Sequence, residues 1–333
     1  MTSNTSPDHL ERTATEPRDK SLHTVVLRHI EEVNDTARVF RLGIPRDSPP
    51  IRFLPGQWLD VYVPGVEKAG GFTITSTPKD ARLPHPPVSS ATSNDESVEA
   101  GPYLELAVQK SPENPPAAWL WRSPASSIIG TELRVRIGGS FVFPPPGINV
   151  RGLRRVVFVA GGMGVNPLVS MLGSLASAAT QPGFEVHFLY SLKDPEPGSK
   201  ERRRARDMLF VERIARIFRL GKVKGRFRVF LTSSSTAERG KEQGQEEDGE
   251  IICTDAGKKG EGETDNTYTI PFHPRRYTID EDVAEALGSP SERRHAVVYV
   301  CGVPSMTDEF VARLTDKDGL GMDSHRVLCE KWW

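Results

Sequence analysis

Residues 156–167 read VVFVAGGMGVNP and decide the fold of the second half of the chain. A wholly apolar run, 156–160, ends at Gly161, Gly162 and Gly164, and a helix is predicted to follow directly. Such glycines let backbone N–H groups approach a pyrophosphate, and the helix N-terminus favours its negative charge. The alternative is a plain turn in which the glycines only supply positive φ. The spacing is not G-x-G-x-x-G, which disfavours an ordinary Rossmann dehydrogenase.

From residue 155 onward, helical stretches alternate with further apolar runs at 185–190, 226–231 and 296–300. Near-continuous apolar strands are typical of a parallel sheet covered on both faces. A helix is expected over 166–179, with Asn166 as its N-cap and Pro167 as its first residue. The sequence therefore predicts an α/β parallel-sheet nucleotide-binding domain over residues 150–333.

The preceding part of the chain reads as short strands separated by Gly/Pro turns: 22–28, 37–42, 58–64, 72–76, 104–108 and 133–137. This pattern predicts a six-stranded antiparallel β-barrel over residues 21–147. Proline suits a first helical turn, so a short helix is expected from Pro115. The Pro-rich run 144–147 marks the boundary between the two domains.

Three segments are too polar to bury much apolar surface and are predicted to be disordered: the tail 1–20 and the insertions 79–101 and 233–267. The first insertion is rich in Pro, Ser and acidic residues. The second is rich in Ser, Gly, Glu and Lys, and its residues 242–250 are strongly acidic.

Composition excludes several classes of function. The chain has 333 residues with a formal net charge of -1, which gives no reason to expect a nucleic-acid partner. It has no apolar stretch of about 18 residues, so no membrane span is expected. Its three cysteines, Cys253, Cys301 and Cys329, are widely spaced and predict neither a disulfide framework nor a metal site.

A second motif, CGVPSM at 301–306, also follows an apolar run and leads into a helix. The carboxyl ends of strands are where open α/β sheets bind ligands, although a free cysteine there is commonly just a small buried apolar group. The chain ends in Trp332-Trp333, and large apolar rings at a terminus suggest stacking on a flat ligand or packing against the protein.

These motifs, in this order, resemble the ferredoxin–NADP⁺ reductase superfamily and, within it, the oxidoreductase NAD-binding-domain-containing protein 1 group. The resemblance runs from about residue 20 to the end, without the two insertions. It rests on PGQW (55–58), GGFTITS (70–76), NPPAAW (114–119), GGSF (138–141), AGGMGVNP (160–167), CGVPSM (301–306) and EKW (330–332).

The resemblance implies a flavin in the barrel, FAD or alternatively FMN. The superfamily's flavin strand reads Arg-x-Tyr-Ser/Thr, and Gly70 stands at the arginine position here. Thr73 would then hydrogen-bond flavin N5, and Phe72 would pack on the flavin, with Ile74 and Thr75 beside them. A second phosphate motif is implied at Gly138, Gly139 and Ser140. The missing arginine removes a bidentate cation from the flavin phosphate.

The resemblance implies NADH or NADPH in the second domain. Gly161, Gly162 and Gly164 would hold the pyrophosphate, with Asn166 and Pro167 beginning the helix behind them. Cys301 and Gly302, followed by Pro304 and Met306, would lie beside the nicotinamide. Glu330 and Trp332 would lie near the flavin, so the implied catalytic residues are Thr73, Cys301, Glu330 and Trp332. Lys193 and the run 202–204 favour NADPH and Asp194 favours NADH, although that run also fits a solvated helix face.

The expected activity is hydride transfer from NAD(P)H to flavin, followed by electron transfer to an acceptor that the sequence does not identify, a protein being one option. The alternative is a nucleotide-binding sensor or scaffold that has lost its flavin, which the glycine at position 70 motivates. A Ser or Cys hydrolase is a third option, disfavoured because no G-x-S-x-G elbow is present. The resemblance implies a mitochondrial location, whereas the acidic residues of the first twenty positions fit a soluble cytoplasmic protein.

Overall fold

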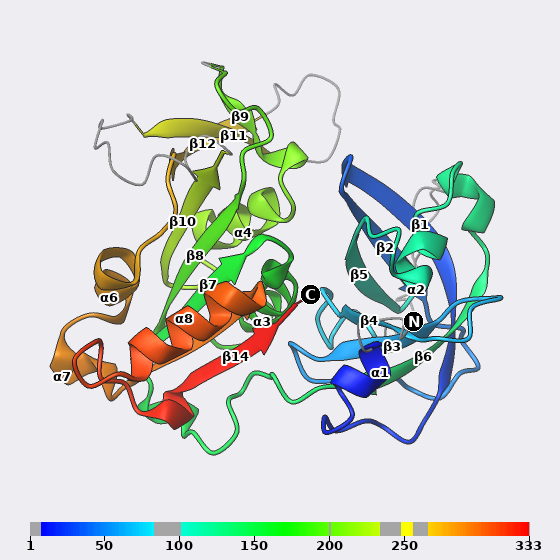
Figure 1. Ribbon diagram of the computed structural model, residues 1–333, viewed down its shortest axis with the longest axis horizontal. Coiled ribbons are helices and arrows are strands. Elements are labelled where there is room, and N and C mark those ends of the chain that lie inside the picture. Colours follow the sequence, from blue (N-terminus) through cyan, green and yellow to red (C-terminus); the bar gives the residue numbers. More distant parts are fainter. Residues whose placement is uncertain (1–7, 83–100, 200, 234–247, 256–265, 333) are drawn as a thin grey trace, which may run out of the picture. The chain divides into compact units, whose positions relative to one another are not determined.

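The computed structural model describes residues 8–82, 101–199, 201–233, 248–255 and 266–332. The chain divides into two compact units, Met1–Phe143 and Pro144–Trp333 (Figure 1). The first is a six-stranded antiparallel sheet, and the second is a mostly parallel sheet with helices. The predicted fold class is thereby confirmed, and the unit boundary lies just before the predicted Pro-rich run.

The first unit contains, in chain order, α1 (His9–Arg12), β1 (His23–Asn34), β2 (Ala37–Gly43), β3 (Trp58–Tyr62), β4 (Gly70–Thr73), β5 (Tyr103–Gln109), α2 (Pro115–Leu120), a 3-10 turn (Ala125–Ile128) and β6 (Glu132–Gly138). Its strand order is β4-β3-β6-β1-β2-β5. An antiparallel bridge between Ile74 and Leu106 joins the two outer strands, so the sheet closes into a barrel. All six predicted strands are present.

The interior of the barrel is filled by alternate side chains of each strand, as the period of two requires. On β3, Leu59 and Val61 belong to the buried core cluster. Trp58 and Asp60 point to the other face of that strand, yet they are also buried, at 2% and 0% exposure. Another part of the chain must therefore cover this outer face.

The cover is the N-terminal segment, which corrects the prediction of a disordered tail for its described part, residues 8–20. Asp8 caps the short helix α1, and its carboxylate accepts a hydrogen bond from the Glu11 backbone N–H. Further along, the backbone N–H of Asp19 donates to the carbonyl of Ile137 on β6 (2.9 Å). We call residues 8–19 the N-terminal strap.

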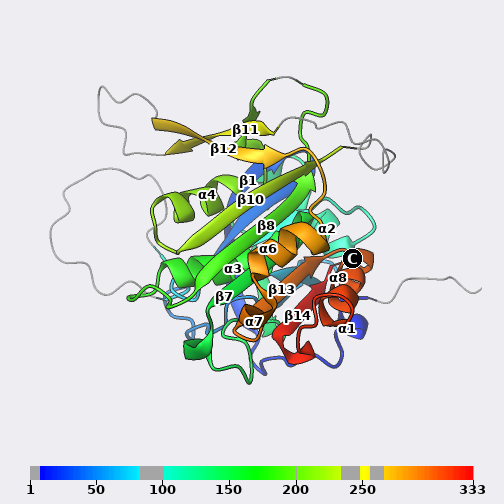
Figure 2. The ribbon, with the colours of Figure 1, turned by 90° about the vertical axis from the view of Figure 1, so that its left-hand side faces the viewer.

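The second unit contains β7 (Arg155–Gly161), α3 (Val165–Ala176), β8 (Glu185–Lys193), β9 (Arg203–Arg204), α4 (Val211–Arg219), β10 (Gly225–Thr232), β11 (Gly249–Asp255), β12 (Asn266–His273), a π-helical turn (Ile279–Val283), α6 (Ala284–Leu287), α7 (Pro290–Arg293), β13 (Ala296–Gly302), α8 (Pro304–Thr315) and β14 (Val327–Lys331). Short 3-10 turns occupy 150–152, 162–164, 205–207 and 324–326. The strand order is β14-β13-β7-β8-β10-β12-β11-β9. Helices α3 and α4 cover one face, and α6 and α8 cover the other (Figure 2).

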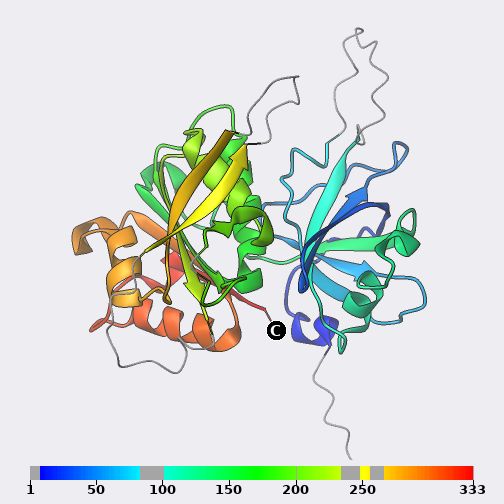
Figure 3. The ribbon, with the colours of Figure 1, turned by 90° about the horizontal axis from the view of Figure 1, so that it is seen from above.

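Several predictions for this unit need correction. Residues 249–255, assigned to a disordered insertion, form β11, which pairs antiparallel with β12 at the edge of the sheet (Figure 3). Helix α3 begins at Val165 with Gly164 as its N-cap, so Asn166 does not cap it. Arg203 and Arg204 form strand β9 instead of a helix face. Residues 266 and 267 of the same insertion begin β12. Residues 234–247 and 256–265, together with 83–100 of the other insertion, lie outside the described residues.

The helices of the described ranges are all too short or too polar to span a bilayer. Within the same ranges, no three histidine, cysteine or carboxylate side chains come together as metal ligands.

Candidate functional site

The predicted nucleotide motifs of the α/β unit meet at the carboxyl ends of three adjacent parallel strands. Ala160 of β7 is in register with Cys301 of β13, and Cys301 is in register with Glu330 of β14. The chain leaves β7 for β8 on one side, while β13 lies on the other side. Open α/β sheets bind ligands outside the carboxyl ends of strands at such a switch point. The structure therefore brings together Gly161, Gly162, Gly164, Cys301, Gly302, Met306, Glu330 and Trp332.

Glycine is required at two positions of the turn after β7 for different structural reasons. Gly162 has a positive φ of 53°, and a Cβ there would meet no atom of the described ranges within 4 Å, so its backbone is exposed. Gly164 is needed for close packing, because a Cβ there would lie 2.0 Å from the carbonyl oxygen of Cys301. The turn is thus held against β13 at one glycine and leaves its backbone accessible at the other.

Cys301 is fully buried at the end of β13. Burial and the nearby Glu330 carboxylate raise the pKa of its thiol well above the ordinary value, although a hydrogen bond with Trp332 opposes them. The side chain is therefore a neutral thiol at physiological pH and not a nucleophilic thiolate. This environment argues against the hydrolase alternative. Asn166 and Pro167 are both buried in the first turn of α3, and Pro304 is the first residue of α8.

The C-terminal residues are tied to the same place. The backbone N–H of Trp332 donates to the carbonyl of Gly302 (3.0 Å), and its indole N–H donates to the Glu330 carboxylate (3.1 Å). Lys331 forms an ion pair with Asp308 of α8 (2.6 Å). The predicted acidic and aromatic residues therefore lie beside Cys301 and Gly302.

The residues that were expected to select NADH or NADPH bind each other. Arg203 is 5% exposed and donates to both carboxylate oxygens of Asp194, at 2.8 and 2.9 Å. Because the bidentate pair satisfies both side chains, Asp194 is not available to bind a ribose hydroxyl and Arg203 is not available to bind a 2′-phosphate. Lys193 lies at the exposed end of β8.

In the barrel, β4 carries the residues expected to contact flavin. Thr73 is 1% exposed, and within the part of the chain that the structure describes its buried hydroxyl has no hydrogen-bond partner. Such a group is costly, about 1–3 kcal/mol, unless something supplies the partner. Phe72 is part of the buried core. At Gly70 a Cβ would lie 2.5 Å from the Phe72 ring and 2.8 Å from Pro116 at the start of α2, so a side chain there has no room in this arrangement.

The next two predicted residues make contacts across the closing edge of the barrel. Ile74 is fully buried in the core. The hydroxyl of Thr75 donates to the Glu105 carboxylate (2.9 Å), and the backbone N–H of Thr75 donates to the Glu105 carbonyl (2.8 Å). Both residues therefore have structural roles in joining β4 to β5.

The groups predicted to form a second phosphate motif are used by the N-terminal strap. The backbone N–H of Gly139 donates to the carbonyl of Pro17 (3.0 Å), and the hydroxyl of Ser140 donates to the Glu16 carboxylate (2.7 Å). Cβ atoms at Gly138 and Gly139 would lie 2.4 and 2.6 Å from the Trp58 indole. These glycines make room for a tryptophan, and the motif offers no free phosphate cradle in this structure.

The strap is anchored on the buried carboxylate of Asp60, which no sequence motif indicated. His9 Nε2 lies 2.9 Å from Asp60 Oδ1, while Oδ2 accepts from Arg18 (3.1 Å) and Arg136 (2.8 Å). Burial alone would raise the pKa of Asp60, but the hydrogen bonds from these partners outweigh it, and the pKa is lowered. An aspartate between apolar residues on a strand was the signal available in the sequence.

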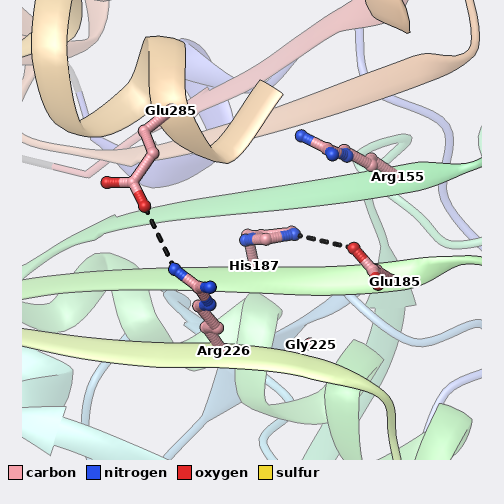
Figure 4. A pocket seen from close by; sticks show the side chains of 6 residues that line it. All are labelled: Arg155, Glu185, His187, Gly225, Arg226 and Glu285. Atoms are coloured by element: carbon pink, nitrogen blue, oxygen red, sulfur yellow. Dashed lines mark hydrogen bonds and ion pairs between the residues drawn. The ribbon is translucent and has the colours of Figure 1, made fainter. Parts of the chain in front are cut away.

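A polar cavity of about 270 Å³ lies at the opposite ends of the α/β strands. It is lined by the amino ends of β7, β8 and β10 and by α6, through Arg155, Glu185, His187, Gly225, Arg226 and Glu285 (Figure 4). Its polar groups pair within the chain: Arg226 forms an ion pair with Glu285 (3.1 Å), and His187 lies 3.4 Å from the Glu185 carboxylate. Within the α/β unit, the cavity lies at the opposite end of the strands from the predicted nucleotide motifs.

Comparison with known proteins gives a full-length match. The chain is 28% identical over 343 residues to oxidoreductase NAD-binding domain-containing protein 1 of Danio rerio, covering 100% of both chains. It is 25% identical over 341 residues to the Homo sapiens protein of that name, covering 100% of this chain and 87% of the human one. No protein-family model matches the chain.

Solved structures show the same fold. The flavohem-like FAD/NAD-binding domain of nitric oxide dioxygenase from Vibrio cholerae matches with a TM-score of 0.58 and 15% identity, covering 93% of this chain and 98% of that one. A ferredoxin NADP⁺ reductase from Neisseria gonorrhoeae, with bound FAD and NADP, matches with a TM-score of 0.55 and 15% identity, covering 95% and 100%. The chain is therefore a full-length homologue of oxidoreductase NAD-binding domain-containing protein 1, with the two-domain fold of ferredoxin–NADP⁺ reductase-like proteins.

Proposed function

We propose that this protein is a flavin-dependent NAD(P)H oxidoreductase, which takes a hydride from the reduced nicotinamide and passes electrons to a separate acceptor. The observation that carries the proposal is the meeting of the glycine turn, Cys301 and Glu330 at the carboxyl ends of β7, β13 and β14. The accessible backbone at Gly162 would hold the pyrophosphate at the start of α3. Cys301 and Gly302 would border the nicotinamide.

The flavin part of the proposal is supported by Thr73. Its buried hydroxyl has no hydrogen-bond partner among the described residues, and a ring nitrogen of flavin would supply one. When bound, the flavin would provide the hydride acceptor, while the protein would supply orientation. The predicted site for the flavin phosphate fits less well, because the Gly139 N–H and the Ser140 hydroxyl are already hydrogen-bonded to the strap.

The first test is the absorbance spectrum of the purified full-length protein with FAD or FMN, recorded before and after adding NADH or NADPH. We expect a flavin spectrum that bleaches on reduction and turnover with an artificial electron acceptor. A protein that binds neither flavin and oxidises neither nucleotide would contradict the proposal.

The second test compares Thr73→Val with Thr73→Ser. Valine has the shape of threonine without the hydroxyl, so the free energy of unfolding should stay the same or rise. Flavin reduction should slow about tenfold, which corresponds to ~1.4 kcal/mol. Serine keeps the hydroxyl and should keep most of the rate. Equal rates in both variants would show that the hydroxyl does not contact flavin.

A second candidate function is a pyridine-nucleotide-binding sensor or scaffold without flavin. It is favoured by the blocked position at Gly70 and by the strap on Gly139 and Ser140. Calorimetric titration separates the two functions. Tight binding of NADH or NADPH together with no flavin binding and no turnover would support the sensor.

A further inference from the structure

Tyr277 lies in none of the motifs, yet it reaches the end of strand β7. It follows β12 and precedes the π-helical turn 279–283. Its ring is 8% exposed and packs edge-on against Phe230 (5.4 Å) and Phe310 (5.5 Å). The ring is therefore fixed by the core under α8, and the direction of its hydroxyl is fixed with it.

The hydroxyl of Tyr277 makes two contacts at the proposed nucleotide site. It donates to the carbonyl of Ala160 (3.1 Å), the residue before the glycine turn, and it lies 3.5 Å from the sulfur of Met306. Burial raises the pKa of this phenol well above its ordinary value. The hydroxyl therefore stays protonated and remains a donor.

Met306 fills the space between the ends of two strands. A Cβ on Gly161 would lie 2.7 Å from its sulfur, and a Cβ on Gly302 would lie 2.9 Å from it. The sulfur thus occupies the volume that only glycines leave free, one at the end of β7 and one at the end of β13. Methionine is flexible, with three rotatable side-chain bonds, so its position here depends on its neighbours.

We propose that Tyr277 is a positioning residue for the nicotinamide end of the nucleotide. It holds Met306 between Gly161 and Gly302 and fixes the carbonyl at the end of β7. It thereby sets the spacing of the two strand ends that would border the nicotinamide. The proposal rests on the function proposed above and adds a residue that acts through Met306 without touching the ligand.

The test compares two probes that differ only in the nicotinamide part. Full-length wild type, Tyr277→Phe and Met306→Leu are titrated calorimetrically with NADH and with ADP-ribose, which lacks the nicotinamide. Phenylalanine keeps the ring in the core and removes only the hydroxyl. We expect Tyr277→Phe to weaken the affinity for NADH about five- to tenfold and to change the affinity for ADP-ribose less than twofold. If the wild type prefers NADPH, that nucleotide and 2′-phospho-ADP-ribose replace the two probes.

A double variant, Tyr277→Phe with Met306→Leu, and a matched control complete the design. Because Tyr277 acts through Met306, the double variant should bind NADH little more weakly than Met306→Leu alone. The matched control is Tyr299→Phe, which removes the hydroxyl of a different buried tyrosine, on β13. It should leave the ratio of the NADH and ADP-ribose affinities unchanged.

The outcomes distinguish this proposal from the function on which it rests. Equal weakening of both probes by Tyr277→Phe, or a loss of thermal stability with no change in either affinity, would overturn the positioning role. A wild-type protein that binds neither NADH, NADPH nor their ADP-ribose analogues would instead overturn the proposed function.

Discussion

Paired glycines occur at the end of β7 and at the end of β6, and the two places differ in what surrounds them. At the end of β7, a Cβ on Gly162 would meet only open space. At the end of β6, Cβ atoms on Gly138 and Gly139 would meet the Trp58 indole. The hydroxyl of Ser140, the next residue, is hydrogen-bonded to Glu16 of the strap. Similar motifs therefore leave backbone groups available in the α/β unit and occupied in the barrel.

The largest effect that tests this difference is expected from Asp60→Ala. The change leaves Arg18 and Arg136 without their buried carboxylate, so the barrel should lose about 3–5 kcal/mol of stability. Urea unfolding followed by tryptophan fluorescence measures it. Nucleotide binding by the α/β unit should persist at low urea. An unchanged urea midpoint would show that the strap is not anchored by this carboxylate.

Gly164→Ala should have the next largest effect. Its Cβ would overlap the backbone of Cys301, and the required shift should cost about 3 kcal/mol and abolish ADP-ribose binding. Gly162→Ala is the matched control for stability: its Cβ would meet no atom of the described residues within 4 Å, and its positive φ should cost about 1 kcal/mol. Equal losses of unfolding free energy in the two variants would contradict the different packing of these glycines.

Acid should destabilise the barrel through Asp60. Its folded pKa is lowered below the ordinary value of 3.8, so the unfolded chain binds more protons in that range. The stabilisation is complete above about pH 4 and is lost as pH falls through the folded pKa. Unfolding free energies of wild type should fall more steeply below that pH than those of Asp60→Asn. Asp282→Asn removes a carboxyl of the α/β unit whose pKa is also lowered. It is the control that separates acid effects on that unit from those on the barrel.

Ser140→Ala should have the smallest effect, below about 1 kcal/mol, because Ser140 and its hydrogen bond to Glu16 are exposed to solvent. If the strap keeps the motif from phosphate, the ratio of FMN to riboflavin affinity should not change. A selective weakening of FMN in this variant would show that flavin phosphate displaces Glu16 and would remove the contrast between the two glycine pairs.

The periodicity of the sequence was enough to place all six barrel strands and the strands β7, β8, β10 and β13. It failed where stability comes from distant partners. Strand β11 lies in a polar segment and forms because β12 pairs along its whole length. His9 and Asp60 are separated by 51 residues, and no local pattern joins them. Tyr277 was missed for the same reason, since its partner Ala160 lies 117 residues away.

The strap also has a consequence for the order of folding. A chain emerges from the ribosome with its N-terminus first. Residues 8–19 are thus made before the strands of the barrel, while Arg136, Gly138 and Ser140 follow more than a hundred residues later. Docking of the strap must therefore wait until β6 has been added. Since His9 packs edge-on against Trp58 at 4.8 Å, the emission of that indole should report this final step in refolding experiments.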